Sequence, residues 1–181
     1  SFIQAADLDG KIPWTILPLS GFFVICTLAD GGDVPGPSDF YVSTDGGENF
    51  ERLGDPDQFR GLPAFTFNAE SRTIYAANKS GDNNQTLYQW EVGSSSAWEE
   101  VVDLSILPGF TSSISGLTLA GDGTLYVSAR NTGSINDDGQ IWRCASFSGD
   151  SREEDFQAVS GSSFDAFGGP IHRGPLTVVN D

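Results

Sequence analysis

The sequence predicts an all-β protein built from repeated units, and three observations support this class. The chain has 22 glycines and 9 prolines, and no window shows a sustained 3.6-residue apolar period, so helices are not expected. Three short apolar segments, 22–26, 73–77 and 124–128, recur at a spacing of 51 residues. An apolar fraction of 38% over 181 residues is enough to form a sizeable core and argues against disorder.

Each recurring segment is expected to be the second of four strands, which we call A to D. An apolar strand A that ends in a tight turn precedes it, as at 64–67 and 117–120. A polar loop follows and leads to strand C, and a further turn leads to an aromatic residue that starts strand D. Strand C is expected at 40–43, 87–90 and 141–144, and the aromatic residues are Phe50, Trp98 and Phe156.

Four short antiparallel strands in a repeat of this length are typical of a β-propeller. We expect one domain over 1–181, with blades at about 12–54, 62–103 and 114–160 and a further inner strand A at 174–179. Three blades are too few to close a ring, because propellers close with typically four to eight. We therefore expect a second copy of the chain, or an additional propeller segment, to complete it. A β-sandwich is the alternative fold.

The turn between strands C and D of the first repeat carries the pattern Ser-x-Asp-x-Gly-x-x-Phe, formed by Ser43, Asp45, Gly47 and Phe50. The Asp45 carboxylate is expected to accept backbone N–H groups within the turn, and Gly47 to take a positive φ angle. Phe50 is expected to fold inward as an anchor. This chemistry is that of local folding, and we interpret these residues as structural.

The pattern resembles the Asp-box, or BNR repeat, of sialidase-like β-propellers, which include sialidases, related glycoside hydrolases and sortilin-type receptors. The other two repeats keep only the aromatic residue: Gly93 stands at the aspartate position of the second, and the loop from Ser146 to Asp155 is longer in the third. The resemblance implies that the Asp-box lies away from the functional face. It also implies that the B-to-C and D-to-A loops of the opposite face bind the ligand.

Those loops supply the candidate binding residues, and their polar side chains are also what ordinary turns use. A function as an exported binding or scaffolding module, with a protein or carbohydrate partner, is the interpretation we favour over enzymatic activity. The alternative is part of a glycoside hydrolase or lyase, in which paired carboxylates would act. No arginine cluster with a Tyr and Glu pair can be placed for a sialidase. The candidate binding residues are Arg60, Asp82, Arg130, Asp137, His172 and Arg173.

The charge and composition of the chain argue against some classes of binding partner. Nine Lys and Arg against 25 Asp and Glu give a net charge of −16, which disfavours nucleic acid and anionic membrane surfaces. The longest apolar run, 22–29, is too short to span a bilayer. The chain begins at Ser1 and contains no Met, which fits a processed or partial protein, and we expect a secreted, extracellular or periplasmic location.

No cofactor is expected. One histidine, His172, and two cysteines on different repeats do not make a zinc site. The oxygen-rich runs 30–33 and 136–139 leave calcium open as an alternative to ordinary turns, although neither has the EF-hand spacing. Cys26 and Cys144 are expected to be unpaired thiols, because their repeats are not adjacent.

Overall fold

The computed structural model describes residues 12–19, 21–28, 37–55, 59–60, 63–78, 85–108, 110, 113–130 and 139–159. Regular structure in this part of the chain is β-strand, apart from two single-turn 3₁₀ helices, η1 (Leu104–Ile106) and η2 (Glu153–Asp155). None of the helices found there is long and apolar enough to cross a membrane.

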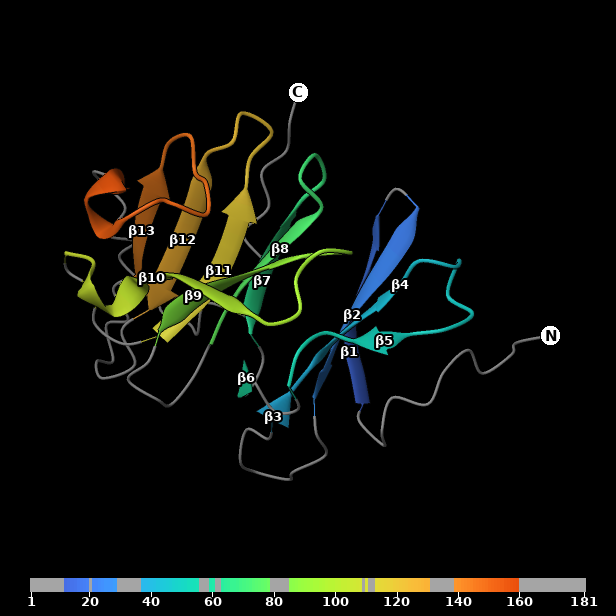
Figure 1. The fold of residues 1–181 in the computed structure, drawn as a ribbon. Coiled ribbons are helices and arrows are strands. Elements are labelled where there is room, and N and C mark those ends of the chain that lie inside the picture. The colour runs from blue at the N-terminus through green and yellow to red at the C-terminus, as the bar shows by residue number, and fades with distance from the viewer. Residues whose placement is uncertain are drawn as a thin grey trace.

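The strands form three four-stranded sheets that follow one another along the chain (Figure 1). In each sheet neighbouring strands pair antiparallel and in chain order, so each sheet is a simple meander. The first contains β1 (Ile12–Leu19), β2 (Phe22–Leu28), β4 (Phe40–Ser43) and β5 (Glu51–Arg52). The second contains β7 (Ala64–Asn68), β8 (Thr73–Ala77), β9 (Thr86–Glu91) and β10 (Glu99–Asp103). The third contains β11 (Ser113–Leu119), β12 (Leu125–Arg130), β13 (Gly139–Cys144) and β14 (Phe156–Ala158).

The repeat is visible in the backbone as well as in the strand pattern. Gly21, Arg72 and Gly123 follow one another at the 51-residue spacing, and their φ angles are 87°, 55° and 81°. Each lies in the connection between strands A and B, where a left-handed residue closes the hairpin. Three repeats thus make the same turn, although only two of them use the glycine that this conformation favours.

The second sheet is covered on both faces. Side chains alternate between the two faces of a strand, so the apolar residues of β8 divide between two cores. Ile74 and Ala76 belong to a core shared with the first sheet, whereas Tyr75 and Ala77 belong to a core shared with the third. All five residues of β8 are therefore buried, and β8 is a continuous apolar strand rather than an alternating one.

The core between the first and second sheets is rich in aromatic residues. The ring of Phe40 packs edge-to-face on Phe59 and Phe65, with centroids 5.3 and 5.2 Å apart. Trp98 lies against Phe59 at 4.9 Å and Trp90 at 5.5 Å, and its indole N–H donates to the Leu53 carbonyl at 3.0 Å. Offset and edge-to-face contacts of this kind add to the stabilisation from burial alone.

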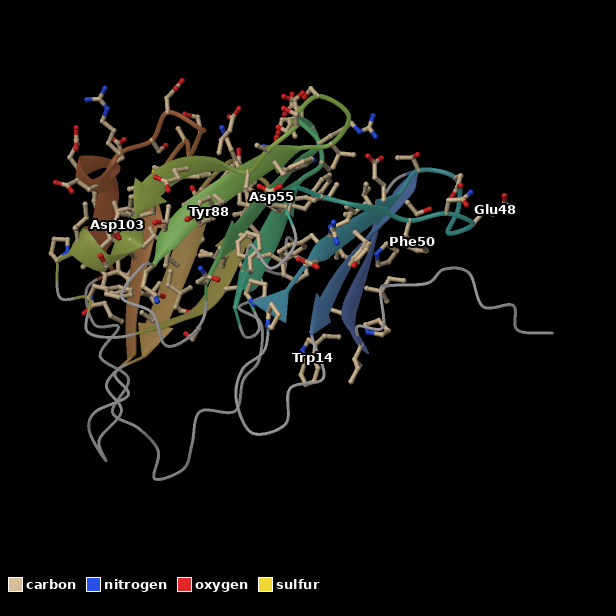
Figure 2. The ribbon with its side chains drawn as sticks, turned by 60° about the horizontal axis from the view of Figure 1, so that its bottom comes forward. Trp14, Glu48, Phe50, Asp55, Tyr88 and Asp103 are labelled. Carbon is tan, nitrogen blue, oxygen red and sulfur yellow. The ribbon has the colours of Figure 1, made fainter. Side chains whose placement is uncertain are left out.

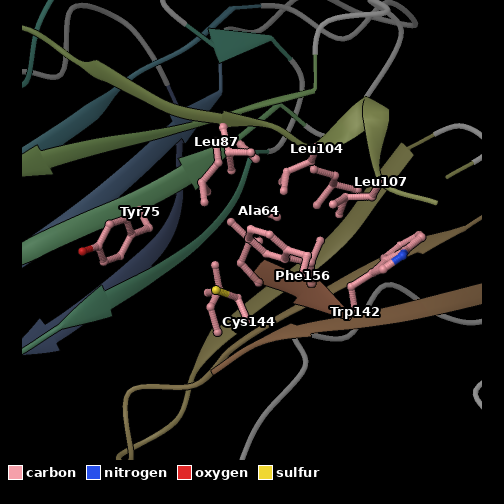
Figure 3. Packing of buried hydrophobic residues seen from close by; sticks show 14 of the residues in the cluster. Ala64, Tyr75, Leu87, Leu104, Leu107, Trp142, Cys144 and Phe156 are labelled. Carbon is pink, nitrogen blue, oxygen red and sulfur yellow. The ribbon is translucent and has the colours of Figure 1, made fainter. Parts of the chain in front are cut away.

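The core between the second and third sheets is larger and contains more aliphatic residues (Figure 3). Tyr75 packs on Phe147 with ring centroids 4.9 Å apart, and Phe147 in turn contacts Phe156. Strands β7 and β11, the first strands of their sheets, also lie next to each other. The Leu119 N–H donates to Thr66 Oγ1 at 3.1 Å and joins these two strands.

The predicted all-β fold of propeller blades is confirmed. Three sheets stacked in chain order, with the middle one covered on both faces, differ from the two-sheet sandwich held as the alternative. The expected inner strand at 174–179 lies outside the described residues. A short two-stranded sheet of β3 (Pro37–Ser38) and β6 (Phe59–Arg60) was not predicted.

Candidate functional site

The two ends of the sheets differ in the length of their connections. The A-to-B and C-to-D turns lie at one end, which we call the turn end, and include the connections at 20–21, 69–72 and 120–124. The B-to-C and D-to-A connections lie at the other, which we call the loop end. The segments 29–36, 79–84 and 131–138 belong to the loop end and fall outside the described residues. In Figure 1, β3 and β6 mark the loop end, opposite the β7–β8 and β11–β12 turns.

The turn formed by Ser43 to Asn49 satisfies its own polar groups. Asp45 Oδ1 accepts the backbone N–H groups of Glu48 and Asn49, each at 3.0 Å, and the Asn49 side-chain amide donates to Asp45 Oδ2 at 2.7 Å. The Ser43 hydroxyl donates to Asp45 Oδ1 at 2.8 Å and accepts the Gly47 N–H at 2.8 Å. Gly47 has a φ angle of 93°, as the motif requires.

These contacts set the charge state of Asp45. The backbone N–H of Asn49, then the side chains of Asn49 and Ser43, and the backbone N–H of Glu48 hold the pKa of the Asp45 carboxyl well below its usual range. Hydrogen bonds that donate to a carboxylate favour its ionised form. Asp45 is exposed and its acceptor oxygens are committed to the turn, so the geometry is that of a structural residue.

The aromatic residues that begin strand D behave differently in the three repeats. Trp98 and Phe156 pack into the core shared with the preceding sheet. Phe50 is half-buried and belongs to neither core, so it is less inward than the sequence predicts. Figure 2 shows Phe50 close to Glu48 on the first sheet, with Trp14 at the far end of β1.

At the loop end of the first repeat, the B-to-C and D-to-A connections are joined. Strand β3 pairs with β6, so that Pro37 lies opposite Arg60 and Ser38 opposite Phe59. Phe59 is fully buried and contacts Tyr88 of the second sheet edge-to-face at 5.8 Å. Its burial fixes β6, and with it the backbone of Arg60, against the first two sheets.

At the loop end of the second repeat, a buried glutamine joins three segments. The Gln85 carbonyl accepts the Leu104 N–H at 3.2 Å, and Gln85 Oε1 accepts the Ile114 N–H at 3.2 Å. The first bond ties β9 to η1, and the second ties it to β11 of the third sheet. The Trp142 indole N–H donates to the Pro108 carbonyl at 3.1 Å and adds a further bond at this end. The strand ends beneath the loops therefore form a connected frame.

The structure places two of the candidate binding residues on this frame. Arg60 lies in β6 and Arg130 at the end of β12, opposite Ser113 and Gly139, although their side chains lie outside what the structure describes. The candidates Asp82, Asp137, His172 and Arg173 lie outside the described residues altogether. The role of all six as binding residues stays a prediction.

Two aromatic residues that precede a strand A pack between strands: Phe59 joins the first core, and the ring of Phe110 lies 5.8 Å from that of Trp142. The possible calcium runs 30–33 and 136–139 fall almost wholly outside the described residues. In the part of the chain that the structure describes, no group of three or more His, Cys, Asp or Glu side chains could hold a metal ion.

Two buried polar residues at the loop end were not predicted from the sequence. Asp39 and Gln85 are 2% and 1% exposed, although their residue types are mostly found at the surface. The available signal was a pair of polar residues before strand C in two repeats: Ser38 and Asp39 before Phe40, and Gln85 and Thr86 before Leu87. Gln85 acts as a bridge between sheets, as its hydrogen bonds show.

Cys144 is a free, buried thiol of the third sheet. Burial raises its pKa, and the neighbouring Ser151 hydroxyl lies 3.7 Å from the sulfur. The side chain of Cys26 in β2 is outside the described residues, so the expected pair of free thiols is met for Cys144 only.

No protein-family model and no curated protein matches the chain. Among solved structures, it is similar to a protein of unknown function from Dyadobacter fermentans DSM 18053, with 12% identity and a TM-score of 0.50 over 78% of this chain and 48% of that one. It is also similar to the Bacteroides ovatus xyloglucan PUL GH43B protein, with 12% identity and a TM-score of 0.46 over 80% and 28% of the two chains. The chain thus spans about half the length of the first, and at this identity the likeness is one of fold.

Proposed function

We propose that this chain supplies blades of an Asp-box type β-propeller and acts as an exported binding module, with its protein or carbohydrate partner held at the loop end. The observation that supports this most is the contrast between the two ends. At the turn end, the acceptor oxygens of Asp45, Asn68 and Asp122 bind backbone N–H groups of their own turns. The loop end has three connections of at least six residues each, mounted on a hydrogen-bonded frame.

Three acceptor side chains at the turn end serve their own turns. Asp45 is committed to the turn of the first repeat, and Asn68 Oδ1 accepts the N–H groups of Glu70 and Ser71 at 2.9 and 3.2 Å. Asp122 accepts the Thr124 N–H at 2.9 Å in the corresponding turn of the third sheet. Groups bound in this way stabilise the turn and are not available for recognition.

The loop end has the features of a recognition surface. Binding residues are often carried by loops that a rigid scaffold positions. Here the scaffold consists of the β3–β6 pair, Gln85 and the Trp142 bond. The backbones of Arg60 in β6, beside the first sheet, and of Arg130 in the third sheet both lie at this end. Arginine forms bidentate hydrogen bonds with carboxylates and stacks on flat groups, which suits either a glycan or an acidic peptide. The glycoside hydrolase alternative needs paired carboxylates on these loops, and the segments 29–36, 79–84 and 131–138 that would carry them lie outside the described residues.

The proposal is tested by probing the chain with a glycan array that includes neutral and acidic glycans, and with a displayed peptide library. Any binder found should be lost or weakened by Arg60→Ala and Arg130→Ala. Arg152→Ala is the matched control, because Arg152 is an exposed arginine at the turn end. Binding that survives both loop-end substitutions but is lost in Arg152→Ala or Asp45→Asn would place recognition at the wrong end and contradict the proposal.

A further inference from the structure

The first sheet has one face that the second sheet does not cover. Leu17 and Val42 lie on the covered face and pack into the first core. Residues directly opposite each other in an antiparallel pair share a face. Ile16 lies opposite Ile25, which lies opposite Tyr41, so this row belongs to the other face, which we call the outer face. Tyr41 is buried, whereas Ile16 is 59% exposed.

The repeat shows what normally contacts the position of Ile16. Ile25 and Ala76 are separated by the 51-residue repeat, and their partners on strand A are Ile16 and Phe65. Val127 is the next member of the series, and its partner is Leu117. Phe65 packs edge-to-face on Phe40 of the preceding sheet. Leu117 is 4% exposed in the core shared with the preceding sheet. Both equivalents of Ile16 are thus covered by the preceding sheet of the array.

Exposed apolar side chains concentrate on this same strand. Of the four large apolar residues that are strongly exposed in the described part of the chain, Ile12, Trp14 and Ile16 lie on β1, and the fourth, Ile106, lies on η1. The register places Ile16 on the outer face and Ile12, opposite Leu28, in the row of the covered face, with Trp14 at the bulge between them. Phe50, which is half-buried, begins strand D of the same sheet, where its equivalents Trp98 and Phe156 pack on the preceding sheet. Clustered exposed apolar residues mark an interaction site more often than scattered ones do.

The third sheet carries the matching surface. Phe40 of the first sheet covers Phe65 of the second. The residue of the second sheet that is equivalent to Phe40 is Leu87, and it packs in the same core as Leu117 of the third sheet. The next equivalent is Ile141, opposite Ser128 on the third-sheet face directed away from the second sheet. Tyr126 and Ile141 on that face are half-buried, and Arg143 is exposed. By position, this is the face that would cover Ile16.

We propose that the outer face of the first sheet binds the third sheet of a second copy of this chain. The contact is head-to-tail, with Ile16 of one copy against Ile141 of the other. The three described sheets do not close a ring by themselves, because propellers close with typically four to eight blades. Two copies related by a twofold axis satisfy both faces at once and give a ring of six sheets, within the usual range.

The charge of the chain predicts how this association responds to salt. Each copy carries −16, so two copies repel at low ionic strength. The proposed contact is mainly apolar, and burial of apolar surface is not weakened by screening. Dimerisation should therefore strengthen as salt is added, opposite to the response of a contact held by ion pairs.

The mass of the purified chain in solution gives the first test, by light scattering over a wide range of concentration at physiological salt. The expected species has twice the 19.3 kDa of one chain. Ile16→Asp should weaken the association by roughly tenfold to a hundredfold, the range for losing one buried aliphatic side chain. Ile106→Asp is the matched control, because Ile106 is 53% exposed and lies on η1, which follows the second sheet and belongs to neither of the two proposed contact faces.

Cross-linking gives the second test, because it distinguishes a head-to-tail contact from a symmetric one. Ile16→Cys and Ile141→Cys variants are treated with a short bifunctional maleimide, separately and mixed, with the unsubstituted chain as the background for the native thiols. Arg143→Cys repeats the test at an exposed position. Cross-linked dimers above background should appear only in the mixture.

Three results would overturn the proposal. One is a strictly monomeric chain at all concentrations, which would leave the outer face for a further segment of a longer chain. Another is a dimer that Ile16→Asp does not weaken more than Ile106→Asp does. The third is efficient cross-linking of Ile16→Cys to itself, which would indicate a symmetric contact between two first sheets. Circular dichroism of each variant confirms that it is folded.

Discussion

At the turn end, hydrogen bonds to a single side chain fix the conformation of the turn between β4 and β5. Asp45 accepts three N–H groups and one hydroxyl, all from residues of its own turn. The motif could be predicted from the sequence because it is local: all its partners lie within four residues. The inward position of Phe50 was less predictable, since it depends on whether another sheet lies against the first one.

Asp45→Ala should lower the melting temperature by a few degrees, because the turn N–H groups lose their acceptor. The pKa of Asp45 is lowered on folding, so the stabilisation is complete above the unfolded-state pKa of about 4 and is lost as the pH falls from there toward the folded value. The difference in melting temperature between the two proteins should therefore be constant near neutral pH and shrink below about pH 4. A difference that grows on acidification would contradict the assigned role.

Gly54 is a second residue whose identity is fixed by geometry. Its φ angle is 80°, and a Cβ placed there would lie 2.7 Å from Trp98 Cδ1. Gly54→Ala should cost about 2 kcal/mol or more in unfolding free energy, from backbone strain and displacement of the indole. Gly123→Ala is the control: its φ angle is 81°, but nothing lies within 4 Å of the added carbon. Equal losses in denaturant titrations of the two variants would show that the Trp98 contact is unimportant.

At the scale of strands and sheets, periodicity predicted more than connectivity did. The second strands and the C strands were predictable because their apolar patterns recur at a fixed spacing. The β3–β6 pair was not predictable, because each of these strands has only two residues and neither shows a strand-like pattern. The two strands are also far apart in the sequence. Gln85 was missed for the same reason: its partner, Ile114, lies 29 residues away.

The hydrogen bond between Gln85 and Ile114 should stabilise the contact between the second and third sheets. Gln85→Met keeps the volume of the side chain but leaves the Ile114 N–H without its acceptor in the core. The expected loss is about 1–3 kcal/mol in unfolding free energy, the cost of a buried unsatisfied donor. Gln89→Met on the same strand is the control, because Gln89 is half-buried and its amide donates to an exposed carboxylate, Glu99. A loss within about 0.5 kcal/mol, the usual range for a surface change, would mean that the Gln85 bridge does not hold the sheets together.

At the scale of the whole molecule, the three sheets form a row that has a direction. Its turn end differs from its loop end, and the outer face of the first sheet differs from the free face of the third sheet. The sequence predicted the order of the sheets, because the repeat places each after the last. The ligand was not predictable, since recognition would depend on loop side chains whose Asp, Asn and Gly residues serve ordinary turns equally well. The candidate site is therefore defined by the end of the sheets on which it lies rather than by a constellation of side chains.

The second sheet lies between the first and the third and contacts them with opposite faces, and both proposed surfaces depend on this arrangement. Nuclear Overhauser contacts between aromatic rings test it most directly, in protein with labelled Phe and Tyr. Phe65 should contact Phe40, and Tyr75 should contact Phe147, because the ring centroids lie 5.2 and 4.9 Å apart in the two cores. Contacts of Phe40 with Phe147, or of Tyr75 with Phe40, would place both neighbours on the same face and contradict the stacked-blade arrangement.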